Sequence, residues 1–553
     1  MRGLWRGVAS VTVLAAMAWL LAPAGPRDIA PVGRQPVLWR GAYHVHSTVS
    51  DGSGTPDDIA LAARQAGLDF VILTDHGDGT RQPEPPRLVH DVLLIDGVEI
   101  STDDGHYVAL DMTAAPYPLA GAGEAVADDV RRLGGIGILA HPDSPNPALR
   151  WHNPLVDADG YEWLNADTIW RTASMAHVAV RMLTYPFDRA GSLTALAVDP
   201  GTVFGMHDTP RARVPIALAA VDAHARVGWR RDEDPRSGGR TIAKFPSYDA
   251  MFGTAGVVVP WLDGVPSGDA ARDARVVLHA IRHRLAYSAV FSMARTPWVA
   301  LELVEPADTA LQGSDARGAA TLVVRSNAPA DAHIRVRRNG VVIHDVLPAE
   351  WSRALAARES PAVYRAEMVL PARRGWPALP VAVSAARGHN LPHAEVVAAP
   401  ARLVDAGIRA WHVEHDTASA ATVETTATGA RAELRLAGGA RVSQFSALVA
   451  DLDPPPAGAT SVVLELSTDA PMRLSIQLRE PGTGDGLRWR QSAYLDSTPR
   501  TIVLPLGTFM PVPPARGALP LSRVHALLLV TDTVNARPGD ARRLTVHATK
   551  WGL

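Results

Sequence analysis

Between about residues 41 and 295, runs of consecutive apolar residues alternate with segments of helical periodicity. The segment "TPDDIALAARQAG" (55–67) predicts a helix, because Thr55 is a good N-cap residue and two aspartates face the positive end of the helix dipole. The apolar run "LDFVILTDH" (68–76) follows and predicts a buried strand, and a second helix and strand are expected over 124–143. Repeated strand–helix–strand units predict a parallel sheet covered by helices, either open or closed into a barrel.

The pattern changes after about residue 296, where short strands of alternating apolar and polar residues follow one another between turn residues. Asn339-Gly340 is a typical hairpin turn between two such strands. Further on, strands such as "TSVVLELSTD" (460–469) are short and numerous, as in sandwiches of jelly-roll type. We therefore predict an α/β domain over 36–297, a β-sandwich over 298–400 and a jelly-roll-like β-sandwich over 405–553.

The N-terminal segment has the composition of a secretory signal. Arg2 and Arg6 lie just before an apolar run over 8–21, and small residues and prolines follow through residue 26. This run is shorter than the roughly 20 residues that a spanning helix needs. We expect residues 1–26 to be a signal peptide or an uncleaved anchor, and the protein to be exported, periplasmic or extracellular.

Composition narrows the classes of function. The chain has 553 residues and a net charge of −3, which argues against a nucleic-acid binder or a polybasic membrane protein. It contains no cysteine, so disulfides and thiolate chemistry are excluded.

Candidate chemistry lies where the apolar runs end. Sites in parallel α/β folds form at the carboxyl ends of the strands, so polar residues at those positions are expected to meet. His44 and His46 lie on the first strand, and strict alternation along a strand predicts that both point to one face. Six imidazoles and three carboxylates occupy such positions: His44, His46, Asp51, His76, Glu99, His106, His141, Asp222 and His224.

Imidazole and carboxylate are the ligands that Zn, Mn or Fe accept without sulfur. Nine such positions predict two or three divalent metal ions, with Glu99 able to bridge two of them. Such a site favours an anionic substrate, phosphate above all, and lowers the pKa of bound water to about 7. Any one of these histidines could instead be an ordinary hydrogen-bonded residue, and Asp51 could serve the turn "SDGSG" (50–54). Their co-occurrence at successive strand ends favours the metal centre.

Neighbouring residues suggest supporting roles. Asp75 could orient an imidazole or shuttle a proton as a catalytic residue, or it could cap its strand end. Arg226 could bind phosphate or be a surface arginine. Glu162 and Asn165 are expected to line the pocket without binding metal. The remaining histidines of the domain without a partnered pattern are expected to have no special role: His152, His177 and His207.

The set of motifs resembles the PHP (polymerase and histidinol phosphatase) family of metallohydrolases. The motifs that carry the resemblance are His44-x-His46, Ser50-Asp51-Gly52, Thr74-Asp75-His76, Gly97-Val-Glu99, Gly105-His106, Ala140-His141-Pro142 and Asp222-x-His224. The resemblance implies a distorted (βα)7 TIM-like barrel with a dinuclear or trinuclear centre. It assigns His44, His46, Glu99 and Asp222 to one ion; Glu99, His106 and His141 to a second; and Asp51, His76 and His224 to a third.

A weaker resemblance concerns the end of this domain. The segment "VLHAIRHRLAYSAV" (277–290) is similar to the closing helix of secreted carbaryl-hydrolase-type (CehA/McbA-like) metallohydrolases, which tend to carry β domains after the barrel. That resemblance adds carboxylesters and carbamates to phosphate esters as candidate substrates.

The C-terminal β block offers two interpretations. Trp411, Trp489 and Trp551 could be stacking platforms for a glycan or a cell surface, or they could be core aromatics of a sandwich. For the whole chain we predict an exported metal-dependent phosphoesterase that hydrolyses phosphate mono- or diesters with a metal-bridging hydroxide. The alternatives are a carboxylester or carbamate hydrolase using the same centre, and a glycan- or surface-binding protein with an inactive barrel.

Overall fold

The computed structural model describes residues 19–31, 37–154, 156–229, 240–261, 264–305, 315–394, 399–440, 443–481 and 486–553. The chain divides into two compact units. The first comprises residues 1–77, 82–113 and 130–394, and the second comprises 78–81, 114–129 and 395–553. Most of the predicted signal segment, residues 1–18, lies outside the described residues. Within the described ranges, no helix has the length and apolar character needed to cross a membrane.

The first sheet of the first unit contains the strand that carries the two N-terminal histidines. β2 (Val37–Val45), β3 (Phe70–Leu73) and β6 (Val92–Asp96) run parallel in that order. The sheet continues with antiparallel strands on both sides: β5 (Arg87–Val89), β14 (Gly256–Trp261) and β15 (Tyr287–Ala289).

A second, six-stranded sheet has the order β11-β10-β9-β8-β7-β4. Its strands are β4 (His76–Gly77), β7 (Val98–Thr102), β8 (Gly105–Leu110), β9 (Ile136–Leu139), β10 (Gly160–Asn165) and β11 (Ile216–Ala220). The predicted parallel pairing is found in part of this sheet, between β4 and β7 and among β9, β10 and β11, whereas β7, β8 and β9 pair antiparallel. For β7 and β8 the physical reason is their short connection, which makes a hairpin and leaves no room for the crossover that parallel strands require.

Hydrogen bonds join the two sheets. The amide of Val221, just after β11, donates to the Tyr43 carbonyl at 3.0 Å, and the amide of Ala223 donates to the His44 carbonyl at 3.2 Å. Near the other edge, the amide of Gly97 donates to the Leu73 carbonyl at 2.8 Å. The mixed α/β class is confirmed, and closure into a (βα)7 barrel stays a prediction.

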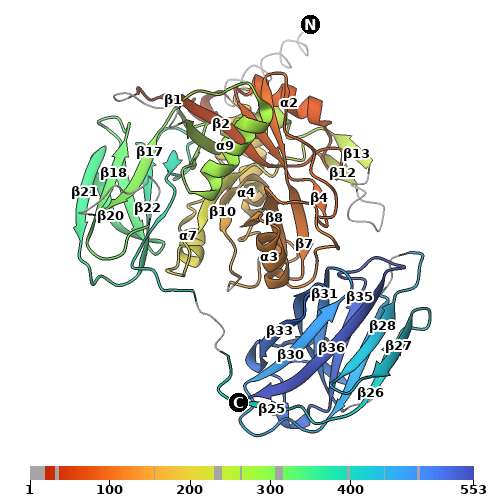
Figure 1. Cartoon of the computed structure of the whole chain (residues 1–553). Coiled ribbons are helices and arrows are strands. Elements are labelled where there is room, and N and C mark those ends of the chain that lie inside the picture. The colour runs from red at the N-terminus through yellow and green to blue at the C-terminus, as the bar shows by residue number, and fades with distance from the viewer. Residues whose placement is uncertain are drawn as a thin grey trace. The chain divides into compact units, whose positions relative to one another are not determined.

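Helices cover these sheets (Figure 1). α2 (Pro56–Gln65) begins at the predicted N-cap, where Thr55 and Asp58 form a reciprocal capping box. The long helix α9 (Ala270–Arg282) belongs to the same unit, and α3 (Gly123–Arg132) follows the predicted pattern and includes residues of both units. Between β10 and β11 the chain forms four further helices, and a fifth precedes β14: α4 (Ala166–Thr172), α5 (Met175–Thr184), α6 (Arg189–Thr194), α7 (Gly201–His207) and α8 (Tyr248–Phe252).

Two short paired elements complete this part of the unit. They are β1 (Arg27–Asp28) with β16 (Ala294–Arg295), and β12 (Val227–Trp229) with β13 (Arg240–Ala243).

The strands between residues 299 and 389 belong to the first compact unit. β17 (Val299–Val304), β18 (Ala320–Ser326) and β21 (Glu350–Leu355) form a three-stranded sheet. The others extend the first sheet, because β23 pairs with β15: β19 (His333–Arg338), β20 (Val341–Leu347), β22 (Ala362–Val369), β23 (Ala382–Val383) and β24 (Arg387–His389). The predicted hairpin at Asn339-Gly340 is confirmed, with φ values of 52° and 75°.

The second unit contains two β-sheets that share one apolar core, drawn in cyan to dark blue in Figure 1. One sheet contains β25 (Leu403–Asp405), β27 (Ala420–Thr425), β28 (Ala430–Arg435), β30 (Ser461–Thr468), β33 (Arg500–Pro505) and β36 (Ala541–Gly552). The other contains β26 (Ile408–His415), β29 (Phe445–Leu452), β31 (Met472–Glu480), β32 (Leu487–Leu495), β34 (Met510–Val512) and β35 (Ala526–Asp532). Short 3₁₀ turns lie at Leu506–Thr508 and Leu521–Arg523.

The three tryptophans of interest are part of this core. Trp489 and Trp551 are 2% and 1% exposed, and Trp411 is partly buried and packs against the same cluster. The structure therefore agrees with the core interpretation of Trp489 and Trp551, and Trp411 keeps part of its surface exposed. A buried indole has no free face on which a sugar ring could stack.

Candidate metal centre

His44 and His46 approach each other because the first strand is irregular at its end. The pairing of β2 with β3 shifts register between Tyr43 and Val45, and His44 has φ of 67°. The strand itself ends at Val45. Simple alternation, from which we predicted one shared face, is therefore the wrong explanation. The β-bulge aims the two rings so that their Nε2 atoms lie 3.1 Å apart.

Backbone strain recurs at other candidate ligands. His141 has φ of 30° and Asp222 has φ of 45°, in the left-handed region that residues other than glycine rarely adopt. Each such residue costs on the order of 1–3 kcal/mol, and clusters of them are typical of functional sites. Three of the nine candidate ligands have a strained backbone. This indicates that the chain adopts costly backbone conformations here in order to place these side chains.

Glu99 lies at the centre of the cluster. Its Oε2 atom is 3.3 Å from His44 Nε2, 3.2 Å from His46 Nε2 and 3.2 Å from His76 Nδ1. Its Oε1 atom is 2.8 Å from His106 Nδ1 and 3.0 Å from His141 Nε2. One buried carboxylate thus contacts five imidazoles that come from four separate places in the chain.

The β7–β8 hairpin explains how His106 reaches this carboxylate. Ser101 pairs with His106 and Glu99 pairs with Val108 across the hairpin. The Glu99 side chain therefore needs to cross little more than one strand spacing to meet the ring at 2.8 Å. The short sequence spacing between the two residues is a consequence of the tight turn.

The first donor group consists of His44, His46 and Glu99, and Asp222 lies beside it. The His44 Nε2, His46 Nε2 and Glu99 Oε2 atoms are 3.1 to 3.3 Å apart, and the Asp222 Oδ1 atom lies 3.5 Å from both histidine Nε2 atoms. Edges of about 3.3 Å are those of a regular tetrahedron whose corners lie about 2.0 Å from its centre, which is the bond length of Zn²⁺ to nitrogen and oxygen ligands. The spacing of these three donors fits one face of such a site.

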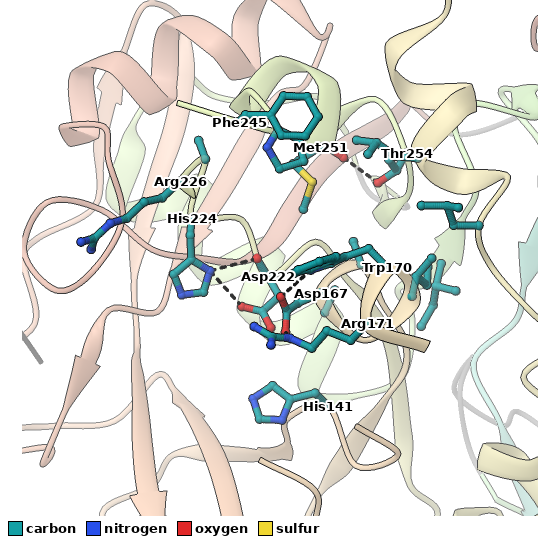
Figure 2. Close-up of a pocket in the computed structure, with 18 of the residues that line it drawn as sticks. His141, Asp167, Trp170, Arg171, Asp222, His224, Arg226, Phe245, Met251 and Thr254 are labelled. Carbon is teal, nitrogen blue, oxygen red and sulfur yellow. Dashed lines mark hydrogen bonds and ion pairs between the residues drawn. The ribbon is translucent and has the colours of Figure 1, made fainter. Parts of the chain in front are cut away.

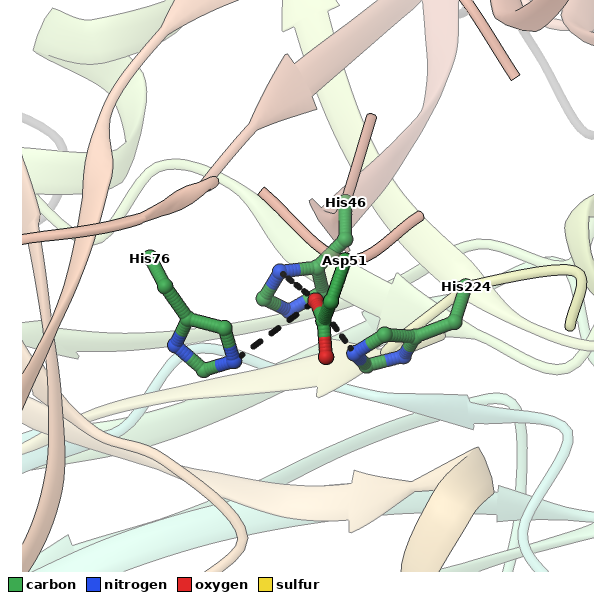
Figure 3. A group of neighbouring side chains, drawn as sticks. All are labelled: His46, Asp51, His76 and His224. Atoms are coloured by element: carbon green, nitrogen blue, oxygen red, sulfur yellow. Dashed lines mark ion pairs between the residues drawn. The ribbon is translucent and has the colours of Figure 1, made fainter. Parts of the chain in front are cut away.

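The second donor group surrounds Asp51 (Figure 3). The Asp51 Oδ1 atom lies 3.2 Å from His224 Nε2, 3.6 Å from His46 Nδ1 and 3.7 Å from His76 Nε2. It is buried and has no hydrogen-bond partner in the structure. A buried carboxylate oxygen that faces three imidazoles instead of turn amides favours the metal interpretation of Asp51 over the turn interpretation.

A third donor group combines Glu99 with His76 and His106. His76 presents Nδ1 to Glu99 and Nε2 to Asp51, so its ring lies between two donor groups. The ligand set implied by the resemblance places His141, not His76, with Glu99 and His106. Because His141 Nε2 also lies 3.0 Å from Glu99, the distribution of the imidazoles over individual ions stays a prediction.

The electrostatics of the cluster favour bound cations. Burial alone would lower the pKa of His46, but hydrogen bonds to Asp222 and Glu99 raise it to about 10. Burial is likewise outweighed at His141, where Glu99 raises the pKa to about 9. Burial would raise the pKa of Glu99, but the charges of His76, His44 and His106 hold that pKa well below its usual range. Carboxylates that stay ionised when buried provide the negative potential that divalent ions need.

Burial dominates at His76, whose pKa it lowers to about 4. The His76 ring is therefore neutral at physiological pH, which is the form that binds metal.

Glu162 and Asn165, predicted to line the pocket, lie behind the donor groups. Glu162 Oε1 is 2.6 Å from His44 Nδ1, and Glu162 Oε2 accepts hydrogen bonds from the His141 amide and the Asn165 side chain, both at 2.8 Å. Because Nδ1 is the ring atom that does not face the donor group, Glu162 fixes the tautomer that leaves Nε2 free to bind metal. Its location on an apolar strand end was the available sequence signal, but its partner is 118 residues away.

We expect Glu162→Ala to weaken metal binding about 10- to 100-fold, the usual cost of losing the partner that orients a ligating histidine. Glu162→Gln keeps an acceptor for His44 Nδ1 and should lose less. The measurement is competition with a chromophoric chelator, with circular dichroism as the folding control. Unchanged metal affinity in Glu162→Ala would refute the orienting role.

Asp75 and Arg226 contact the loop that carries Asp51. The Asp75 carboxylate accepts four hydrogen bonds, at 2.6 to 3.2 Å, from the amides and hydroxyls of Ser47 and Ser50. These bonds match the capping role of Asp75, and its catalytic role stays a prediction. Arg226 Nη1 donates to the Asp51 carbonyl at 3.1 Å, and the side chain lines the cavity described below.

Tyr248 is a supporting residue that sequence reasoning missed. Its hydroxyl donates to the His46 carbonyl at 2.7 Å and accepts hydrogen bonds from the amides of Ser53 and Gly54, both at 3.2 Å. It thereby connects the end of β2 to the turn after Asp51. No local pattern around this tyrosine indicates such a role.

The histidines for which we predicted no special role lie in other surroundings. The His207 ring stacks on Tyr161, with 4.7 Å between the ring centroids. The His177 ring accepts a hydrogen bond from Arg181 at 3.3 Å. The His152 amide donates a hydrogen bond to the Asp104 carbonyl at 2.7 Å.

A cavity of about 650 Å³ opens beside the donor groups. Asp51, His76, Glu99, His141 and His224 line it together with residues of α4, α5, α6 and α8. Figure 2 shows His141 and Asp222 across the drawn space from Phe245. The candidate metal centre is therefore accessible to a small molecule.

No family model matches this sequence, and no curated protein matches it. Among solved structures, the chain is similar to a two-domain protein from Bacteroides vulgatus that contains a predicted PHP-like metal-dependent phosphoesterase. The identity is 12%, the match covers 66% of this chain and 98% of that chain, and the TM-score is 0.27. A proposed metal-dependent phosphoesterase from Bifidobacterium adolescentis is 13% identical over 38% of this chain and 94% of its own, with a TM-score of 0.22.

The chain is also similar to a family 11 carbohydrate-binding module from Clostridium thermocellum in complex with a mixed-linked tetrasaccharide. The identity is 19%, the match covers 28% of this chain and 96% of the module, and the TM-score is 0.23. All three TM-scores are below 0.5, so the functional conclusion rests on the geometry of the site.

Proposed function

We propose that the protein is a metal-dependent phosphoesterase of PHP type. The observation that carries this proposal is the convergence of six imidazoles on the buried carboxylates Glu99 and Asp51, with Asp222 beside His44, His46 and His224, at the edge of an accessible cavity. Donor edges near 3.3 Å, and an Asp51 Oδ1 that faces three imidazoles without a hydrogen bond, fit divalent ions better than they fit a hydrogen-bonded polar core.

His44, His46 and Glu99 would hold one ion, with Asp222 as the fourth ligand that the resemblance implies, and Asp51, His76 and His224 would hold another, with His106 and His141 completing the set at Glu99. When bound, two or three divalent ions supply Lewis-acid stabilisation of the charge at phosphorus and activate a water molecule. The chain itself contributes orientation: Glu162 holds His44, and Asp75 holds the loop that bears Asp51. Arg226, at the cavity wall, supplies a guanidinium suited to phosphate oxygens.

Two other proposals remain for the whole chain. A carboxylester or carbamate hydrolase could use the same donor groups, and the apolar part of the cavity wall supports it as the second candidate. Export through residues 1–26 and a glycan or surface contact of the second unit are also proposals, supported by the signal-like composition and by the β-sandwich architecture.

Metal analysis and hydrolysis tests decide between these functions. The purified protein is analysed for Zn, Mn and Fe, and then assayed with p-nitrophenyl phosphate, bis-p-nitrophenyl phosphate and p-nitrophenyl acetate. We expect bound transition metal and turnover of a phosphate ester, and we expect His44→Ala/His46→Ala to lose both. His152→Ala/His177→Ala is the matched control, because these rings lie outside the donor groups.

Three results would change the conclusion. Absence of transition metal after growth in supplemented medium, or full activity in His44→Ala/His46→Ala, would overturn the metal-dependent mechanism. Turnover of the acetate ester alone would favour the carboxylester alternative. Metal binding without turnover of any ester would leave a metal-stabilised binding protein.

A further inference from the structure

The cavity beside the metal centre has a polar end and an apolar end. The donor groups form the polar end. Six side chains from β10, the helices α4 to α6 and α8 contribute aliphatic or thioether surface elsewhere: Leu164, Ile169, Val178, Met182, Leu193 and Met251. In Figure 2, Met251 and Phe245 project into the drawn space from the side opposite His141.

The whole cavity is larger than a phosphate group requires. Cavities of 300–1,000 Å³ typically enclose a drug-sized ligand, and this cavity has about 650 Å³. Apolar walls gain free energy when an apolar group covers them and removes their surface from water, whereas a small hydrophilic ester would leave most of that surface in contact with water. The wall composition thus indicates what the rest of the substrate is made of.

Helix α5 shows that this apolar surface is directed into the cavity. Val178 and Met182 are one helical turn apart and both line the cavity. Met175 on the same helix is 81% exposed. One face of the helix therefore lines the cavity, and another face is exposed to solvent.

Positive charge adjoins the polar end. Arg171 and Arg226 both line the cavity, and Arg171 forms an ion pair with Asp167 on its own helix. Guanidinium groups next to a divalent-metal centre favour an anionic group at that end. The two ends together define an amphiphilic ligand with one anionic head.

We propose that the natural substrate is an anionic ester, a phosphate ester first, whose alcohol part is a sizeable apolar alkyl or aryl group held by α4 to α6. This inference rests on the proposed function for the identity of the reaction. The apolar group sits against Val178, Met182 and Leu193 while the phosphate faces the donor groups.

The test varies the apolar alkyl group of the ligand (its tail) and keeps the anionic phosphorus group (its head) constant. Calorimetry measures binding of methylphosphonate and of n-octylphosphonate, below its micelle concentration, to the metal-loaded full chain, and hydrolysis of methyl phosphate and n-octyl phosphate is compared in parallel. Burial of each methylene should strengthen binding roughly threefold, so we expect at least about a 100-fold preference for the octyl ligand.

A matched pair of variants on α5 locates the tail. Met182→Gln should reduce the octyl preference about tenfold and leave methylphosphonate binding unchanged, whereas Met175→Gln should change neither. Equal affinity of the wild-type protein for both phosphonates overturns the inference, and so does an octyl preference that Met182→Gln leaves intact.

The outcomes also separate this inference from the proposed function. Hydrolysis of both phosphate esters without any chain-length preference overturns the apolar substrate and leaves the phosphoesterase. An octyl preference in calorimetry without hydrolysis of either ester overturns the phosphoesterase and supports an amphiphilic ligand.

Discussion

Glu99→Gln is expected to remove metal binding and hydrolysis together. Glu99 is 1% exposed, and its two oxygens contact five imidazoles at 2.8 to 3.3 Å. Glutamine keeps the shape, but it loses the charge and replaces one oxygen with an amide that donates hydrogen bonds. Loss of an orienting partner already costs 10- to 100-fold in metal affinity, so loss of a shared donor should reduce kcat/KM by about a thousandfold or more.

The readouts are metal content by plasma mass spectrometry and hydrolysis of p-nitrophenyl phosphate. Glu84→Gln is the matched control, because Glu84 is exposed on the same unit. A Glu99→Gln protein that retains its full complement of metal would contradict the central position of this carboxylate. If the variant retained metal but lost activity, Glu99 would be a ligand of only one of the ions.

The sequence allowed the members of the site to be predicted better than their arrangement. Apolar runs end just before or at His76, His141 and Asp222, so a local pattern marked each of them. The arrangement depends on features without a local pattern, such as the bulge at His44 and the antiparallel β7–β8 hairpin. The bulge follows from the pairing of β2 with β3, which a helix separates in the sequence, and single-residue preferences do not encode such pairing. The hairpin is a local turn, but it brings Glu99 and His106 together only through the register of its two strands.

Supporting residues were harder still to predict. Glu162 contacts His44 across 118 residues of sequence, and Tyr248 reaches the His46 carbonyl across 202. The helices α4 to α6 that shape the cavity lie in one long connection after β10, and their order in the chain does not indicate which side chains face the site. Such contacts exist only once the sheets have brought the strand ends together.

The strands after residue 298 are tied to the α/β part by a buried ion pair. Arg365 on β22 forms two hydrogen bonds to Asp208, from Nε at 2.8 Å and from Nη2 at 2.7 Å, and Tyr161 on β10 donates to the same carboxylate at 2.7 Å. Arg365 and Asp208 are 0% and 1% exposed. Burial would lower the pKa of Arg365, but Asp208 raises it above its ordinary value, so the guanidinium stays charged.

Arg365→Met should therefore destabilise the first unit by about 3–5 kcal/mol, because it leaves the Asp208 carboxylate buried and unpaired. Arg365→Met/Asp208→Leu should recover much of that loss, since an apolar pair of similar volume has no charge to desolvate. Chemical denaturation of the three proteins measures the difference. If the single variant is as stable as the wild type, water reaches Asp208 and the ion pair does not hold β22 to β10.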